Sequence, residues 1–83
     1  MTDWVETECR KRIEDGEAKY GPWTAENFRL TNRNGVNEAI PELLDCINYL
    51  EMSYQRHEIS ISEFKYYEVI LTDICERLKR RAT

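Results

Sequence analysis

The sequence predicts an all-α protein of three helices, and two observations carry this prediction. Helix-forming residues dominate the chain, and no stretch alternates between polar and apolar residues for long. Only three glycines and two prolines interrupt it, and Gly16 is the one glycine inside a predicted helix. With 83 residues, the chain has room for a single domain, residues 1–83.

The first predicted helix spans residues 3–20. Thr2 or Asp3 can cap its first turn. Its narrow apolar stripe consists of Val5, Cys9, Ile13 and Tyr20. Gly16 occupies the missing step of this stripe, where a glycine costs roughly 1 kcal/mol relative to alanine. We therefore expect that a neighbour packs closely against Gly16, or that the helix bends or frays there.

Residues 21–36 are predicted to form a loop. Gly21 followed by Pro22 is a strong stop signal for a helix, and residues 32–35 have the composition of a turn. The segment between them carries three large apolar residues, Trp23, Phe28 and Leu30. It is too apolar for a solvated linker, so we expect it to cover one end of the helices or to act as a lid over a ligand.

The second predicted helix spans residues 37–56. Asn37 is a good N-cap, which places Pro41 at the fourth helical position, where a missing donor is still tolerated. The apolar residues repeat at intervals of three and four, as in an amphipathic helix: Ile40, Leu43, Ile47, Leu50 and Tyr54.

The third predicted helix spans residues 61–81. Ser60 and Glu63 have the spacing of a capping box. Its apolar stripe is Phe64, Tyr67, Leu71, Ile74 and Leu78. Two long helices with matched stripes and a short link predict an antiparallel hairpin, with helix 3–20 packed against it. A chain this short has a thin core, so we expect the leftover apolar surface to form a homodimer or higher oligomer.

Composition excludes several classes of partner. The formal net charge of −4 argues against general nucleic-acid binding, which needs a basic surplus. No stretch approaches the about 20 apolar residues of a membrane span, and the N-terminus has no apolar signal-peptide run. Three widely spaced cysteines fit neither a zinc site nor a disulfide framework, so we expect a cytoplasmic protein.

Three carboxylates recur along the second predicted helix. Glu38, Glu42 and Asp45 are four and three residues apart, which places them on one side of the helix, opposite its apolar stripe. A solvated face explains this pattern. A site for Mg²⁺ or Mn²⁺ between this face and another helix also explains it, because hard divalent ions take carboxylate oxygens as ligands.

The stretches RIEDGEAKYGPW and NRNGVNEAIPELLDCINYLEM resemble the MazG-like all-α nucleotide pyrophosphohydrolases, in particular small phage- and prophage-type relatives. Glu42 and Asp45 match the E-x-x-D ligand pair of that family, and Glu38 lies one turn earlier. The resemblance implies a dimeric enzyme that uses Mg²⁺ to hydrolyse an NTP or dNTP to the monophosphate and pyrophosphate. The second ligand pair of the family, E-x-x-E, has no clean match. Glu14 and Glu17 have its spacing, although a solvated helix end also explains them.

Four further residues are candidate substrate contacts. Lys19, Tyr20 and Trp23 could hold a phosphate and a base beside the acids, and Tyr49 lies on the acidic side of its helix. Packing of the two aromatic residues at the end of the first helix is the alternative for Tyr20 and Trp23.

The leading hypothesis from the sequence is a cytoplasmic, Mg²⁺-dependent nucleotide pyrophosphohydrolase-like protein with Glu38, Glu42 and Asp45 as catalytic metal ligands. The rival is a small phage-type helical protein that binds and inhibits or regulates a host protein without catalysis. A nucleotide binder without turnover lies between the two.

Overall fold

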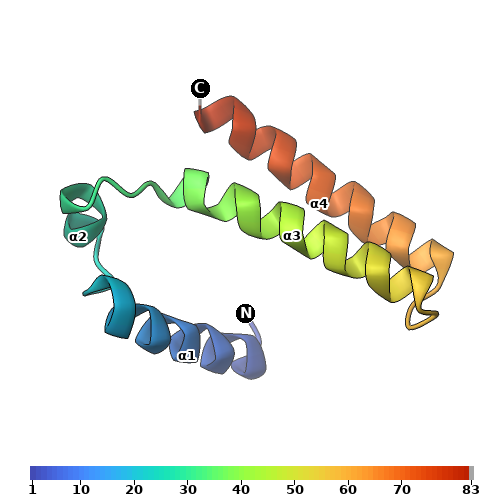
Figure 1. Cartoon of the computed structure of the whole chain (residues 1–83), viewed down its shortest axis with the longest axis horizontal. Helices are drawn as coiled ribbons and strands as arrows, with labels where there is room; N and C mark the ends of the chain where they lie inside the picture. Colours follow the sequence, from blue (N-terminus) through green and yellow to red (C-terminus); the bar gives the residue numbers. More distant parts are fainter. Residues whose placement is uncertain (83) are drawn as a thin grey trace. The chain divides into compact units, whose positions relative to one another are not determined.

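The computed structural model describes residues 1–82, which form four α-helices and contain no strand (Figure 1). The helices are α1 (Asp3–Tyr20), α2 (Ala25–Leu30), α3 (Gly35–Gln55) and α4 (Ile61–Ala82). The all-α class is confirmed, and α2 is a helix that the sequence prediction lacks. The chain divides into two compact units, of which the first ends at Arg33 and the second begins at Asn34.

Helix α1 has the bounds that the sequence predicts. Thr2 is its N-cap, and the Thr2 hydroxyl accepts a hydrogen bond from the Val5 amide at 3.3 Å. The expected close packing against Gly16 is not found, because a Cβ added there would meet no atom within 4 Å. The helix nevertheless continues through Gly16 to Tyr20.

Helix α2 corrects the prediction that residues 21–36 are a loop. Thr24 caps it, with its hydroxyl accepting from the Asn27 amide at 3.1 Å, and the Asn27 side-chain amide donates to the Tyr20 carbonyl at 3.1 Å. Gly21 makes the turn between α1 and α2 with φ of 87°, a conformation that glycine adopts without a Cβ clash. At six residues, α2 is too short to show a periodic apolar pattern in the sequence.

Helix α3 begins two residues before the predicted range of 37–56. Its N-cap is Asn34, whose side-chain oxygen accepts from the Val36 and Asn37 amides at 2.9 and 3.2 Å. Pro41 therefore lies beyond the first turn rather than at its fourth position. Because proline has no amide hydrogen, the Asn37 carbonyl lacks the donor that an ordinary residue at position 41 would supply.

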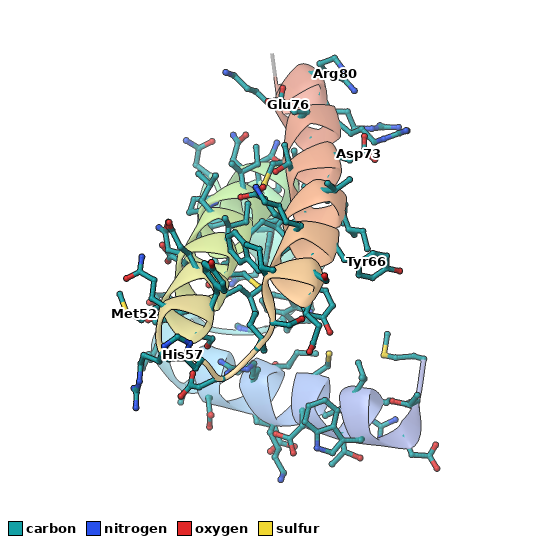
Figure 2. The ribbon with its side chains drawn as sticks, turned by 90° about the vertical axis from the view of Figure 1, so that its right-hand side faces the viewer. Met52, His57, Tyr66, Asp73, Glu76 and Arg80 are labelled. Atoms are coloured by element: carbon teal, nitrogen blue, oxygen red, sulfur yellow. The ribbon has the colours of Figure 1, made fainter. Side chains whose placement is uncertain are left out.

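The link between α3 and α4 comprises residues 56–60. His57 has a positive φ of 62° and lies at this turn in Figure 2. The Ser60 hydroxyl accepts from the Glu63 amide at 3.1 Å, which is the first half of the predicted capping box. The Glu63 carboxylate accepts a hydrogen bond from the Tyr67 hydroxyl at 3.4 Å.

Helices α3 and α4 lie side by side and run in opposite directions (Figure 1). Of the side chains that the structure describes, Phe64 alone is buried, with 7% of its surface exposed. Around it lie half-buried side chains: Leu43, Ile47 and Leu50 on α3, and Leu71, Cys75 and Leu78 on α4. Three residues of the predicted apolar stripes, Tyr54, Tyr67 and Ile74, are exposed. The hairpin therefore has a seam of contacts rather than a closed core. The packing of α1 against it stays a prediction.

Candidate functional site

The three carboxylates of α3 share one exposed side of that helix. Glu38, Glu42 and Asp45 are all exposed, while the residues that face α4 are half-buried. Tyr49, a predicted substrate contact, is 76% exposed. Within the hairpin, α4 thus leaves the acidic side of α3 uncovered.

These acids do not by themselves form a metal site. Across residues 1–82, no group of three or more His, Cys, Asp or Glu side chains lies close enough together to hold a metal ion. Residues three and four apart on a helix are neighbours on its surface, so the three acids share one side of α3. The role of Glu38, Glu42 and Asp45 as metal ligands therefore stays a prediction.

Glu14 and Glu17, the candidates for a second ligand pair, are exposed residues of α1. Glu17 has a structural role that the sequence did not reveal, since its carboxylate accepts a hydrogen bond from the Trp23 amide at 3.1 Å. This bond closes the turn between α1 and α2. A metal site shared by Glu14, Glu17 and the acids of α3 remains a prediction from the sequence.

Lys19, Tyr20 and Trp23 lie at the end of α1 and in the turn that follows. Lys19 is exposed in the last turn of α1, where a cation complements the helix dipole. The Arg33 guanidinium lies 5.0 Å from the centre of the Tyr20 ring and 4.5 Å from that of Phe28. Trp23 meets Phe28 edge to face, with ring centres 5.0 Å apart.

This aromatic cluster matches the packing alternative for Tyr20 and Trp23, and it adds two members that sequence reasoning missed, Phe28 and Arg33. No local signal pairs Arg33 with the rings, because their meeting depends on the path of α2. Trp23 and Tyr20 remain 51% and 60% exposed, so they are still accessible to a ligand. Their role as substrate contacts stays a prediction.

A second feature, an apolar groove, runs along one side of the hairpin. It is lined by Cys46, Leu50, Tyr67, Ile70 and Leu71, and no polar atom contributes to its surface. The sequence predicted leftover apolar surface, but it did not locate this groove. The reason is that the groove depends on how far each helix is rotated about its own axis.

The outer surface of the hairpin carries further exposed apolar residues. Figure 2 shows Tyr66 on the side of α4 turned away from α3, and Met52 on the outer side of α3. Their exposed fractions are 65% and 53%. No helix within residues 1–82 has both the length and the apolar character needed to span a bilayer.

Comparison with known proteins places the chain in no family. No protein-family model matches it, and neither does any curated protein or solved structure. The resemblance to MazG-like pyrophosphohydrolases therefore stands on the residues of α1 and α3 quoted above, as an expectation.

Proposed function

We propose that the chain acts by binding protein through the apolar surface that its hairpin leaves uncovered, and that a second copy of the chain is its first partner. The observation that carries this proposal is the burial of Phe64 alone among the described side chains. A hairpin with so little buried apolar area gains little stability from its own packing. Covering the groove and the neighbouring side chains with another protein supplies the missing burial.

The groove supports the proposal further, since Ile70, Tyr67 and Ile74 form a continuous exposed stripe on α4. Their exposed fractions are 41%, 36% and 38%. Residues 67, 70 and 74 follow one another at helical spacing, so they lie on one side of α4, next to the seam. Such a stripe beside a half-buried seam is the usual anchor for a helix of a partner.

Sedimentation equilibrium over a range of protein concentrations tests this function. We expect a reversible dimer or higher oligomer that Ile70→Glu weakens, because the substitution places a charge in the groove. Val69→Glu is the matched control: Val69 is the next residue along the chain, is 67% exposed and points away from the groove. A wild-type chain that stays monomeric at every concentration contradicts self-association.

A host protein, the partner in the rival hypothesis from the sequence, is the alternative partner for this surface. A complex with one defined protein, recovered at fixed stoichiometry and indifferent to a chelator, supports that form of the proposal. We propose the cytoplasm as the compartment of this activity, because the three cysteines are free thiols, as is usual in a reducing environment.

Nucleotide hydrolysis is the second candidate function. It is favoured by the shared exposed side of α3 that carries Glu38, Glu42 and Asp45, and by the resemblance to MazG-like enzymes. In this proposal, ligands from another helix complete a Mg²⁺ or Mn²⁺ site. When bound, such an ion would shield phosphate charge and activate a water.

A panel of NTPs and dNTPs with Mg²⁺ or Mn²⁺, followed by pyrophosphate release, tests the second candidate. We expect turnover that Glu42→Gln abolishes, because the amide removes a charged ligand while keeping the side-chain shape. Glu51→Gln, on another side of the same helix, serves as the control. Saturable nucleotide binding without pyrophosphate would indicate a binder, and absence of both would leave the protein-binding function alone.

A further inference from the structure

The dipeptide Asn34–Gly35 lies where the second unit begins, and it has a chemical property that no other asparagine of the chain shares. Glycine has no Cβ, so its backbone nitrogen can reach the side-chain amide of a preceding asparagine without a steric clash. The remaining asparagines are each followed by a residue whose side chain shields that nitrogen. They are Asn27, Asn32, Asn37 and Asn48, which precede Phe28, Arg33, Glu38 and Tyr49. The sequence thus singles out Asn34 for reaction with its own backbone.

The reaction is deamidation, and it needs only water and a base such as hydroxide. The Gly35 nitrogen loses its proton to the base and attacks the side-chain carbon Cγ of Asn34, which forms an N–Cγ bond and a cyclic imide. The Cγ–Nδ2 bond breaks, and Nδ2 takes up a proton and leaves as ammonia. Water then opens the imide at Cγ to give aspartate, or at the main-chain carbonyl carbon to give isoaspartate, in which the chain runs through the former side chain.

In the folded chain, the N-cap geometry of Asn34 opposes this reaction. Its side-chain oxygen accepts from the Val36 and Asn37 amides at 2.9 and 3.2 Å, which fixes the side chain over the first turn of α3. The imide also requires Cβ of Asn34 and the Gly35 nitrogen to lie on the same side of the Cα–C bond, which for an L-residue means a negative ψ. Asn34 has a ψ of 121°, so ring closure requires the backbone to rotate out of the cap conformation.

The first turn of α3 is lightly held, so this rotation is accessible. Asn34 and Gly35 are both exposed, and a Cβ built on Gly35 meets no atom within 4 Å. Besides the two cap bonds, the Asn34 carbonyl accepts from the Glu38 amide at 2.9 Å. Pro41 supplies no amide to the Asn37 carbonyl, which interrupts the hydrogen bonds of α3 one turn later. Helix ends with exposed backbone hydrogen bonds are among the parts of a protein that open at the lowest cost in free energy.

We propose that Asn34 is a deamidation site and that opening of the first turn of α3 sets the rate of the reaction. While the turn is closed, the cap bonds and the positive ψ keep the side-chain amide away from the Gly35 nitrogen. Each opening of the turn allows the two groups to meet. The side chain that caps α3 is therefore also the reactive group, and this inference is independent of the partner that covers the groove.

The two products have different effects on α3. Aspartate keeps an oxygen acceptor for the Val36 and Asn37 amides, and it adds a negative charge at the helix N-terminus, where the helix dipole favours it. Isoaspartate adds the former Cβ to the main chain, so the cap bonds cannot form in the same geometry. Modification therefore either preserves the beginning of α3 or loosens the junction at which the second unit starts.

Peptide mapping after incubation of the whole chain in mildly alkaline buffer tests the proposal. The tryptic peptide that begins at Leu30 or Asn34 and ends at Arg56 contains two internal controls, Asn37 and Asn48. Tandem mass spectrometry assigns the replacement of the amide by a carboxyl group to one of these residues. We expect it at Asn34, and at least about fivefold faster in urea that unfolds the chain, because the cap bonds are then lost.

Gly35→Ala is the matched variant, because its Cβ meets open space and shields the backbone nitrogen. We expect it to keep the circular dichroism of wild type and to slow the modification at least about tenfold. A peptide of residues 31–38, too short to hold a helix, measures the effect of urea on the chemistry alone. Modification at Asn37 or Asn48 as fast as at Asn34, or none at Asn34 in urea, overturns the site. Equal rates in buffer and in urea, corrected with the peptide, overturn the control by helix opening and leave Asn34 as the site.

Discussion

The ring of Tyr54 on α3 stacks on the ring of Phe64 on α4, with centres 5.8 Å apart and planes inclined by 23°. This pair closes the hairpin next to its turn, and it contains the one buried side chain among those described. Tyr54 itself is 36% exposed, so the stack is covered on one side only. The one buried side chain of the hairpin, among those described, therefore lies next to the turn, where the chain connection already keeps the helices together.

Phe64→Ala should remove most of the independent stability of the hairpin. Replacing a buried phenylalanine by alanine costs about 3 kcal/mol or more, which is a large fraction of the stability available to so small a domain. We expect a clear loss of helical circular dichroism and a lower urea midpoint. Tyr66→Ala is the control, because Tyr66 is 65% exposed on the same helix and should change the midpoint little. Equal losses in both variants would show that Phe64 is not the anchor of the hairpin.

Alanine should have opposite effects at the two glycines of the first unit. At Gly16 an added Cβ meets open space within a helix, so Gly16→Ala should stabilise α1 by about 0.5–1 kcal/mol. At Gly21 the φ of 87° disfavours any Cβ, and Gly21→Ala should destabilise the turn by about 1–3 kcal/mol. Amide hydrogen exchange of residues 10–24 measures both effects. Stronger protection from exchange in Gly21→Ala would show that the chain leaves α1 by another path.

The capping role of Asn34 can be separated from that of Asn37. Asn34→Ala should destabilise the beginning of α3 by about 1 kcal/mol, because the Val36 and Asn37 amides lose their acceptor. Asn34→Asp should keep the cap. Asn37→Ala should be neutral or slightly stabilising, since alanine is the better helix former inside α3. Thermal denaturation compares the two alanine variants. If Asn37→Ala melts at a lower temperature than Asn34→Ala, the helix begins at Asn37, as the sequence suggests.

The hydrogen bond from the Trp23 amide to Glu17 gives a further prediction. Glu17→Ala should loosen the turn between α1 and α2 by about 1 kcal/mol and shift the fluorescence of Trp23 to longer wavelength. Measurements in a Trp4→Phe background isolate the signal of Trp23. Glu14→Ala, one turn earlier on the same helix, should leave this signal unchanged. A matched loss of Mn²⁺ binding in both variants would instead identify the two residues as a metal-ligand pair.

The long helices could be predicted from the sequence because their apolar residues repeat over about four turns. Leu43, Ile47 and Leu50 leave little choice about which side of α3 meets α4. The beginning of α3 could not be fixed in the same way, since Asn34 and Asn37 are equally good caps by residue type. The earlier cap is the one used, and it adds two residues to the helix despite the proline at position 41.

Only the part of the candidate site that lies on a single helix, α3, could be predicted from the sequence. The spacing of Glu38, Glu42 and Asp45 correctly indicates one exposed side of α3. Whether those oxygens meet a cation depends on residues brought in from another helix, and no periodic pattern within one chain encodes that meeting. The contact of Arg33 with two aromatic rings was hidden for a similar reason, because it follows from the conformation of residues 21–33.

The shortness of the link between α3 and α4 has a consequence for the order in which this unit folds. Residues 56–60 bring Tyr54 and Phe64 together across a loop of about ten residues, which a chain closes in about 10–100 ns. Each further contact between α3 and α4 lies one turn farther from the link than the contact before it. The contacts therefore form in order from the link towards the open end of the hairpin, and none requires residues far from an existing contact to meet. The open end of the hairpin is therefore the last part to form and the first to open. This end contains the beginning of α3 and the last turns of α4.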